Sequence, residues 1–143
     1  MSNFSADAFM GTEVEGVGET EYTPIPENEY TALIKEVKAD TTPKGNPFLE
    51  LIWIIDDQTV RDLIGMEEPT VRQTLWLDIS DSGALEFGKN KNIQLNKVRS
   101  ALGQNDGKPW SPNMMRGRPA TILIKHRLGD QGQIYADVKA VRA

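Results

Sequence analysis

The chain contains no cysteine and a single histidine, His126. Without cysteine the protein cannot form disulfides, use a thiolate nucleophile or hold zinc through sulfur ligands. One histidine leaves no histidine pair for a metal and no second imidazole for a proton relay. The absence of cysteine also fits a reducing compartment. The sequence therefore predicts a protein that is not an enzyme and has no catalytic residue, metal or cofactor.

Long apolar runs are missing as well. No stretch approaches the roughly 18 consecutive apolar residues that a membrane-spanning helix needs. Residues 1–11 lack the basic start and the apolar centre of a signal peptide. These absences predict a cytosolic protein with no membrane partner.

Basic residues are absent from the first 30 positions, which hold seven acidic residues. The net charge is −7 over residues 1–30, −6 over 31–88, +8 over 89–127 and zero over 128–143, which gives −5 for the chain. The average suggests that nucleic acid would be repelled, but at short range the local distribution of charge matters more. Residues 89–127 therefore predict a basic binding surface, with an ordinary solvated face as the alternative.

The acidic start of the chain predicts a flexible arm over residues 1–28, followed by one domain over residues 29–143. Glycines and prolines interrupt any periodicity in the arm, and its acidic side chains repel one another. Such a segment buries too little apolar surface to offset the entropy lost on ordering. Phe4, Phe9 and Met10 are exceptions and predict a short docking element.

Five strands and one helix are expected after the arm, with the strands over residues 30–38, 48–56, 71–79, 120–128 and 133–141. The helix is expected over residues 91–102, where Leu95, Val98 and Leu102 form an apolar stripe and Gly103 follows the last turn. Residues 57–69 are expected to form a loop, and Pro112 to begin one helical turn.

This order, with a helix between the third and fourth of five strands, is that of the OB-fold. The OB-fold is a five-stranded Greek-key β-barrel that commonly binds oligonucleotides. The predicted fold class is therefore an all-β barrel with an acidic N-terminal arm. Another small β-rich or α+β domain is the alternative.

Two segments imitate ligand-binding motifs. Residues 83–90 resemble a phosphate-binding loop, but Asn90 replaces the hydroxyl that holds magnesium and Glu86 would repel phosphate. Residues 78–83 resemble the start of a calcium loop, but Lys89 stands where the bidentate glutamate belongs. Neither segment is expected to bind its ligand.

Single-strand binding requires cations that follow the backbone and flat side chains on which bases stack. Strand alternation predicts that Arg72, Thr74 and Trp76 face outward from the third strand. In the fifth strand it predicts Ile134, Ala136, Val138 and Ala140 inside. His126 is expected to be half-buried beside Ile122 and Ile124, and Trp53 to lie in the core of a strand that is covered on both faces. The predicted nucleic-acid-binding residues are Arg72, Trp76, Trp110, Arg116, Arg118, Lys125, Arg127, Tyr135 and Lys139, where Trp110 either stacks on a base or pins its loop to the barrel.

Several stretches also resemble small bacteriophage single-stranded DNA-binding proteins. They are PENEYTALIKE (26–36), KGNPFLEL (44–51), LNKVRSALG (95–103), PWSP (109–112) and RGRPATI (116–122). The resemblance covers roughly residues 24–141. It implies an OB-fold, a role in phage DNA replication or recombination, and a place in the cytoplasm of an infected bacterial host. Many such proteins end in an acidic tail that recruits partners, whereas this chain ends Lys139-Ala-Val-Arg-Ala143 and has its acidic segment at the other end.

The predicted function is therefore the binding of single-stranded DNA with little sequence specificity. Replication or recombination proteins and a second copy of the chain are candidate partners. The main alternative is a non-enzymatic protein-interaction or virion module on a similar β-barrel. A metal-dependent nuclease is the third hypothesis.

Overall fold

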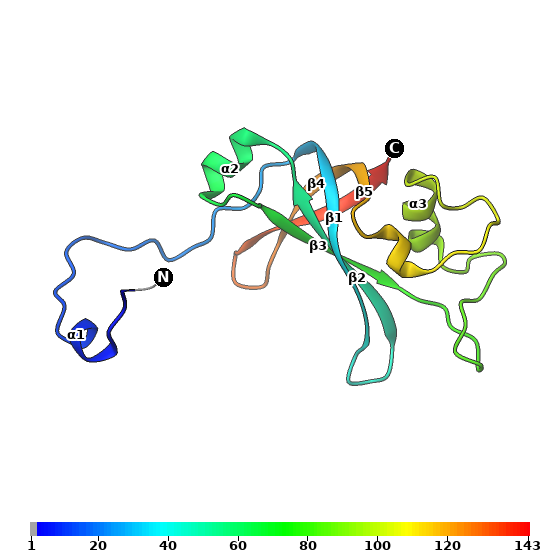
Figure 1. Ribbon diagram of the computed structural model, residues 1–143, viewed down its shortest axis with the longest axis horizontal. Coiled ribbons are helices and arrows are strands. Elements are labelled where there is room, and N and C mark those ends of the chain that lie inside the picture. The colour runs from blue at the N-terminus through cyan, green and yellow to red at the C-terminus, as the bar shows by residue number, and fades with distance from the viewer. Residues whose placement is uncertain (1–2) are drawn as a thin grey trace.

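Five antiparallel strands form one sheet in the computed structural model, which describes residues 3–143 (Figure 1). The strands lie in the order β3-β2-β1-β4-β5, so that the first strand of the chain is central. The mostly β fold with five antiparallel strands is confirmed. The bounds are β1 (Asn28–Thr41), β2 (Pro47–Ile55), β3 (Thr70–Trp76), β4 (Pro119–Leu128) and β5 (Ile134–Arg142).

β1 is the central strand, and its two partners use different parts of its length. It pairs with β4 over residues 28–33 and with β2 over residues 32–41. The register between β1 and β2 shifts at Lys35, so that this residue forms a bulge. An extra residue changes the phase of the alternation, and both Ile34 and Val37 are therefore buried. The bulge bends β1 around the core.

β3 and β5 are the two edges of the sheet. They approach each other, but they form no strand pairing within the described residues. The sheet is therefore curled without being closed by backbone hydrogen bonds. A closed barrel stays a prediction.

The core lies on one face of the sheet. In β2 the side chains of Leu49, Leu51, Trp53 and Ile55 are buried, whereas the four alternate side chains from Phe48 to Ile54 are only half-buried. The outer face of this strand is therefore only partly covered, whereas the sequence pattern predicts two covered faces. The prediction that Trp53 lies in the core is confirmed, and its indole N–H donates to Gln73 Oε1 at 3.0 Å.

Two of the helices follow the sequence pattern. Helix α3 (Ile93–Ala101) lies between β3 and β4 in the chain, and the stripe of Leu95, Val98 and Leu102 is buried against the core. A short 3₁₀ helix, η1 (Pro112–Met115), begins at the expected proline. No helix within residues 3–143 has both the length and the apolarity to span a membrane.

Helix α2 (Gln58–Ile64) occupies a segment that the sequence analysis treats as a loop. Its first turn is capped by Asp57, whose carboxylate accepts the Val60 N–H at 2.9 Å. Gly65 ends the helix with a φ of 75°, a conformation that favours glycine. Asp57 and Gly65 are residue types typical of turns, and in this structure they cap the two ends of a short helix.

The N-terminal segment contains α1 (Ala6–Met10), and all of residues 3–23 are exposed. The body begins at Ile25, which is buried and whose carbonyl lies 2.8 Å from His126 Nε2. Glu27 accepts the His126 backbone N–H at 2.7 Å, and this bond lowers the pKa of the Glu27 carboxyl. Contacts of the body therefore reach back four residues before the expected start at Glu29.

Candidate nucleic-acid interface

The outer face of β2 and β3 carries two aromatic side chains. Arg72, Thr74 and Trp76 face outward, as strand alternation predicts, and Trp76 is 57% exposed. The strand register places Phe48 of β2 opposite Trp76. The two rings meet edge to face, with centroids 5.5 Å apart and planes inclined by 62°. Edge-to-face contact leaves part of each ring surface open to another flat group.

Two arginines near these strands are each paired with a carboxylate. Arg72 Nη1 lies 3.4 Å from Glu50 Oε1 on the same face of the sheet. Arg116 Nη2 lies 3.0 Å from Glu36 Oε1 and donates to the Val37 carbonyl at 2.9 Å. Exposed ion pairs of this kind contribute about 0–1 kcal/mol, so a phosphate can replace the carboxylate at little cost.

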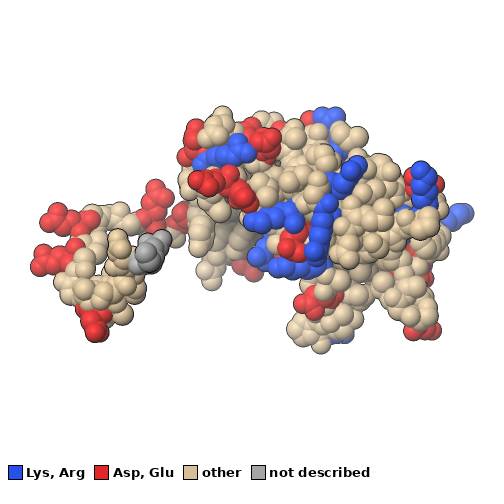
Figure 2. Space-filling view, viewed as in Figure 1, with Lys and Arg blue, Asp and Glu red and all other residues tan. Residues whose placement is uncertain are grey.

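Basic and acidic side chains gather on different parts of the surface. Figure 2 shows Lys and Arg side chains gathered over the strands at the centre of the view. The acidic side chains lie mainly on the N-terminal segment and around α2. Arg118 precedes β4 directly and is exposed, and its backbone carbonyl accepts the Ile34 N–H at 3.0 Å beside the β1 bulge. The basic residues that follow α3 are thus anchored to β1.

A second group of predicted residues lies on the β4–β5 hairpin. Lys125 and Arg127 are exposed, and Arg127 Nε donates to Asp137 Oδ2 at 2.8 Å. This bond raises the pKa of Arg127. The Arg127 guanidinium also lies 4.8 Å from the centroid of the Tyr135 ring. The hairpin therefore presents a cation and an aromatic ring together, with one carboxylate between the two basic side chains.

The hairpin extends beyond the core, which corrects one expectation. Residues 125–128 are all exposed, and His126 is therefore exposed rather than half-buried. Figure 1 shows the β4–β5 hairpin and the β1–β2 hairpin both extending from the lower side of the body.

Lys139 lies apart from Tyr135, because a second bulge changes the phase of β5. Leu123 pairs with Ala140 and Ile124 pairs with Val138, so Lys139 is the extra residue. Beyond the bulge Val141 packs against the core and Ala140 is exposed, so the expectation that Ala140 faces inward is wrong. Ile134 is also exposed, at 50%, because it lies near the tip of the hairpin. Lys139 lines a groove of about 760 Å³ between α3 and β5.

Trp110 pins its loop to α3. Its indole N–H donates to Gln104 Oε1 at 2.9 Å, and the Arg99 guanidinium lies 4.3 Å from the ring centroid. One face of the ring is therefore already covered by a cation. Of the two roles considered for Trp110, these contacts favour the pinning role.

No protein-family model matches the chain, and no curated protein matches its sequence. The evidence for a nucleic-acid-binding site therefore lies in the geometry of this structure.

Sequence reasoning missed Phe48 and the acidic neighbours of the cations. Phe48 stands in a nearly continuous apolar run, which suggested a strand buried on both faces. The register of β2 against β3 is the information that places Phe48 beside Trp76, and the sequence does not contain it directly.

Asp78, the first residue of the segment that resembles a calcium loop, has a structural role. The Asp78 carboxylate accepts the Asn92 backbone N–H at 2.7 Å, so Asp78 acts as a tie between β3 and α3. Within residues 3–143 no group of three or more His, Asp or Glu side chains is arranged to hold a metal ion.

Proposed function

We propose that the chain binds single-stranded DNA, without catalysis and with little sequence specificity, on the outer face of β2 and β3. The observation that carries this proposal is the exposed Trp76 ring beside the half-buried Phe48 ring, with Arg72 on the same face. Aromatic side chains beside cations bind single strands because every base has a flat face and every linkage carries a phosphate. A stacking surface of this kind favours unpaired bases over duplex.

The strand order supports an OB-fold for this face. In the OB-fold, strands two and three form the binding face and the loops between strands one and two and between strands four and five flank it. Here β3 and β5 are the edges that would meet to close such a barrel, and they lie close together. The β1–β2 and β4–β5 hairpins hold the places of those two loops in the chain, and both extend from the lower side of the body (Figure 1).

A fluorescence titration tests the proposal directly. Of the three tryptophans, Trp53 is buried and Trp110 is bonded within its loop, so Trp76 is the one that bases can reach. We expect oligo(dT) to quench tryptophan emission strongly at low salt, and we expect the Trp76→Phe variant to lose most of that quenching. Equal affinity for duplex and single strand of one length would contradict the proposal. Loss of DNA strands in the presence of magnesium would show a nuclease instead.

The biological setting follows from the resemblance to phage single-strand binders. We propose a role in phage DNA replication or recombination, in the cytoplasm of an infected bacterium. Proteins of those two processes, or a second copy of the chain, would then be the partners.

One observation favours a second candidate, a protein-interaction or virion module. Glu36, Glu50 and Asp137 partly neutralise the cations of the proposed interface. Mixed charge of this kind suits a protein partner better than a polyanion. Absence of oligo(dT) binding at low salt would favour this candidate.

A further inference from the structure

The segment between β3 and α3, residues 77–92, is held by a buried hydrogen-bond network. Asn92 is 4% exposed, and its side-chain amide donates to the carbonyls of Asp78 at 3.0 Å and Glu86 at 2.9 Å. Its side-chain oxygen accepts the Asp78 N–H at 2.8 Å. Asn92 thus ties the start, the middle and the end of the segment together.

Two stretches of this segment are exposed, residues 81–84 and residues 87–90, and the second belongs to the tip formed by residues 85–91. Ile79 and Leu85 form a β-bridge, and Leu85 packs against the core. Beyond Leu85 the chain turns at Gly88, with a φ of 128°, and again at Asn90, with a φ of 62°. Phe87 stands at this turn and is 78% exposed. A large aromatic ring is therefore presented to solvent by a loop that is fixed on both sides.

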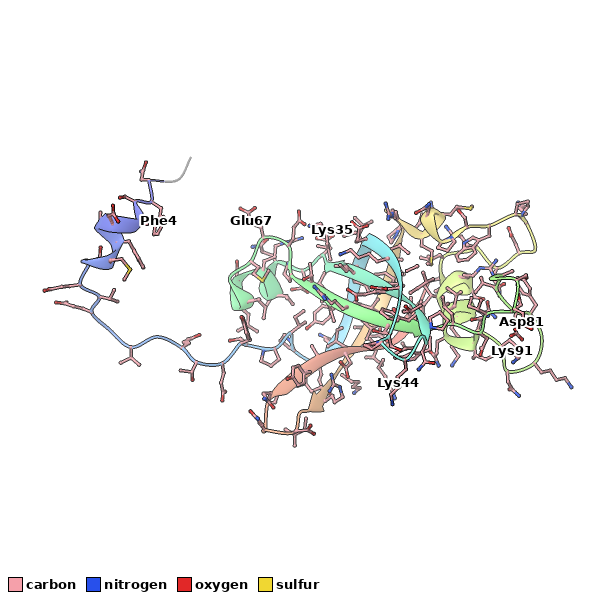
Figure 3. All side chains as sticks on the ribbon, turned by 90° about the horizontal axis from the view of Figure 1, so that it is seen from below. Phe4, Lys35, Lys44, Glu67, Asp81 and Lys91 are labelled. Carbon is pink, nitrogen blue, oxygen red and sulfur yellow. The ribbon has the colours of Figure 1, made fainter. Side chains whose placement is uncertain are left out.

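The tip also carries positive charge. Lys91 is paired with Glu86 at 3.4 Å. Lys89 is exposed and forms no ion pair within the described part of the chain. Figure 3 shows Lys91 and Asp81 at the end of the body opposite Phe4, with Lys44 on the neighbouring β1–β2 loop. The tip thus combines an aromatic ring and a cation, the same two kinds of side chain that the β2–β3 face presents.

An apolar pocket joins the tip to that face. The pocket has a volume of about 560 Å³, and its walls include Phe48, Leu77 and Leu85. Phe48 is also the partner of Trp76, and Leu85 precedes Phe87 by two residues. The pocket therefore places Phe48 of the β2–β3 face and Leu85 at the base of the tip on the walls of one cavity.

We propose that this tip, residues 85–91, is a second contact for the same DNA strand. Phe87 stacks on a base, Lys89 binds a phosphate, and the strand reaches them from the Phe48–Trp76 pair across the apolar pocket. The inference rests on the proposed single-strand binding and adds to it an extended site. Short oligonucleotides fill the β2–β3 face alone, and longer ones also reach the tip.

A length series of oligo(dT) tests this second contact. The Phe87→Ala variant of the full chain is compared with wild type by anisotropy of labelled oligo(dT) of increasing length. Removal of one stacking ring weakens binding by about 1–3 kcal/mol, which is roughly 5- to 150-fold. We expect that loss for long oligonucleotides and none for the shortest ones that bind. Leu63→Ala is the matched control, because Leu63 is a 51% exposed apolar residue on α2.

The Phe87→Trp variant gives an independent readout. In a Trp76→Phe background, the new tryptophan should be quenched only by oligonucleotides long enough to reach the tip. Equal affinity of wild type and Phe87→Ala at every length would overturn the inference, as would an equal loss at every length. Failure of wild type to bind any oligo(dT) would instead refute the proposed function. Because Phe87 is exposed, thermal unfolding of Phe87→Ala should match wild type.

Discussion

Replacement of Trp76 by alanine removes the exposed ring of the proposed interface. If a base stacks on that ring, the affinity for oligo(dT) should fall by about 1–3 kcal/mol, or roughly 5- to 150-fold. The fold should survive, because Trp76 is 57% exposed. Its edge-to-face contact with Phe48 contributes about 0.5–1.5 kcal/mol beyond the area buried, and domains of this kind have about 5–15 kcal/mol of stability.

The measurement is anisotropy of a labelled oligo(dT) at one fixed salt concentration, since the intrinsic reporter is lost with Trp76. Trp76→Phe keeps a ring at the position and should lie between wild type and Trp76→Ala. Leu63→Ala on α2 removes exposed apolar surface at the acidic side of the body and should bind like wild type. A folded Trp76→Ala variant with wild-type affinity would refute the reasoning and remove Trp76 from the site.

Three further predictions address the cations, the N-terminal segment and the segment between β3 and α3. Replacing Lys125 and Arg127 together by alanine should flatten the slope of log affinity against log salt by about 1.4, because each phosphate contact on a single strand contributes about 0.7. An unchanged slope would indicate that DNA binds to another face of the protein. Deleting residues 1–24 should raise the affinity for oligo(dT) at low salt, because a tethered polyanion competes with DNA, and the increase in affinity should shrink as salt is added. Unchanged affinity at low salt would show that the acidic segment does not compete. Asn92→Ala should lower the free energy of unfolding, measured in urea, by roughly 1–3 kcal/mol, because it leaves buried carbonyl and amide groups unpaired. The control is Asn105→Ala, at an exposed asparagine, and equal urea midpoints for the two variants would contradict a structural role for Asn92.

The sequence predicts those parts of the fold that depend on local periodicity. The stripe of Leu95, Val98 and Leu102 marks α3, and the alternation around Trp76 assigns the two faces of β3 correctly. In both cases the spacing of the side chains along a single helix or strand is enough to predict which of them are buried.

The sequence does not predict features that arise from pairing between elements. The bulge at Lys139 depends on the register of β5 against β4, and it reverses the face of every residue that follows. Phe48 joins the candidate site only through its partner on β3. Asp57 and Gly65 are turn formers in isolation and helix caps in context, so α2 is missed. The sequence therefore predicts which types of residue form the candidate site more completely than it predicts how those residues are arranged in space.

The carboxylates beside the cations have a consequence for how DNA would be released. Arg72, Arg116 and Arg127 each already hold a carboxylate partner on the surface. If the chain binds DNA as proposed, an arriving phosphate replaces a carboxylate, and the carboxylate returns when the phosphate leaves. Each exchange is small in free energy, so a single nucleotide gains little, whereas a long strand makes many such exchanges at once. A strand bound in this way can be peeled off one phosphate at a time, with no large barrier at any step.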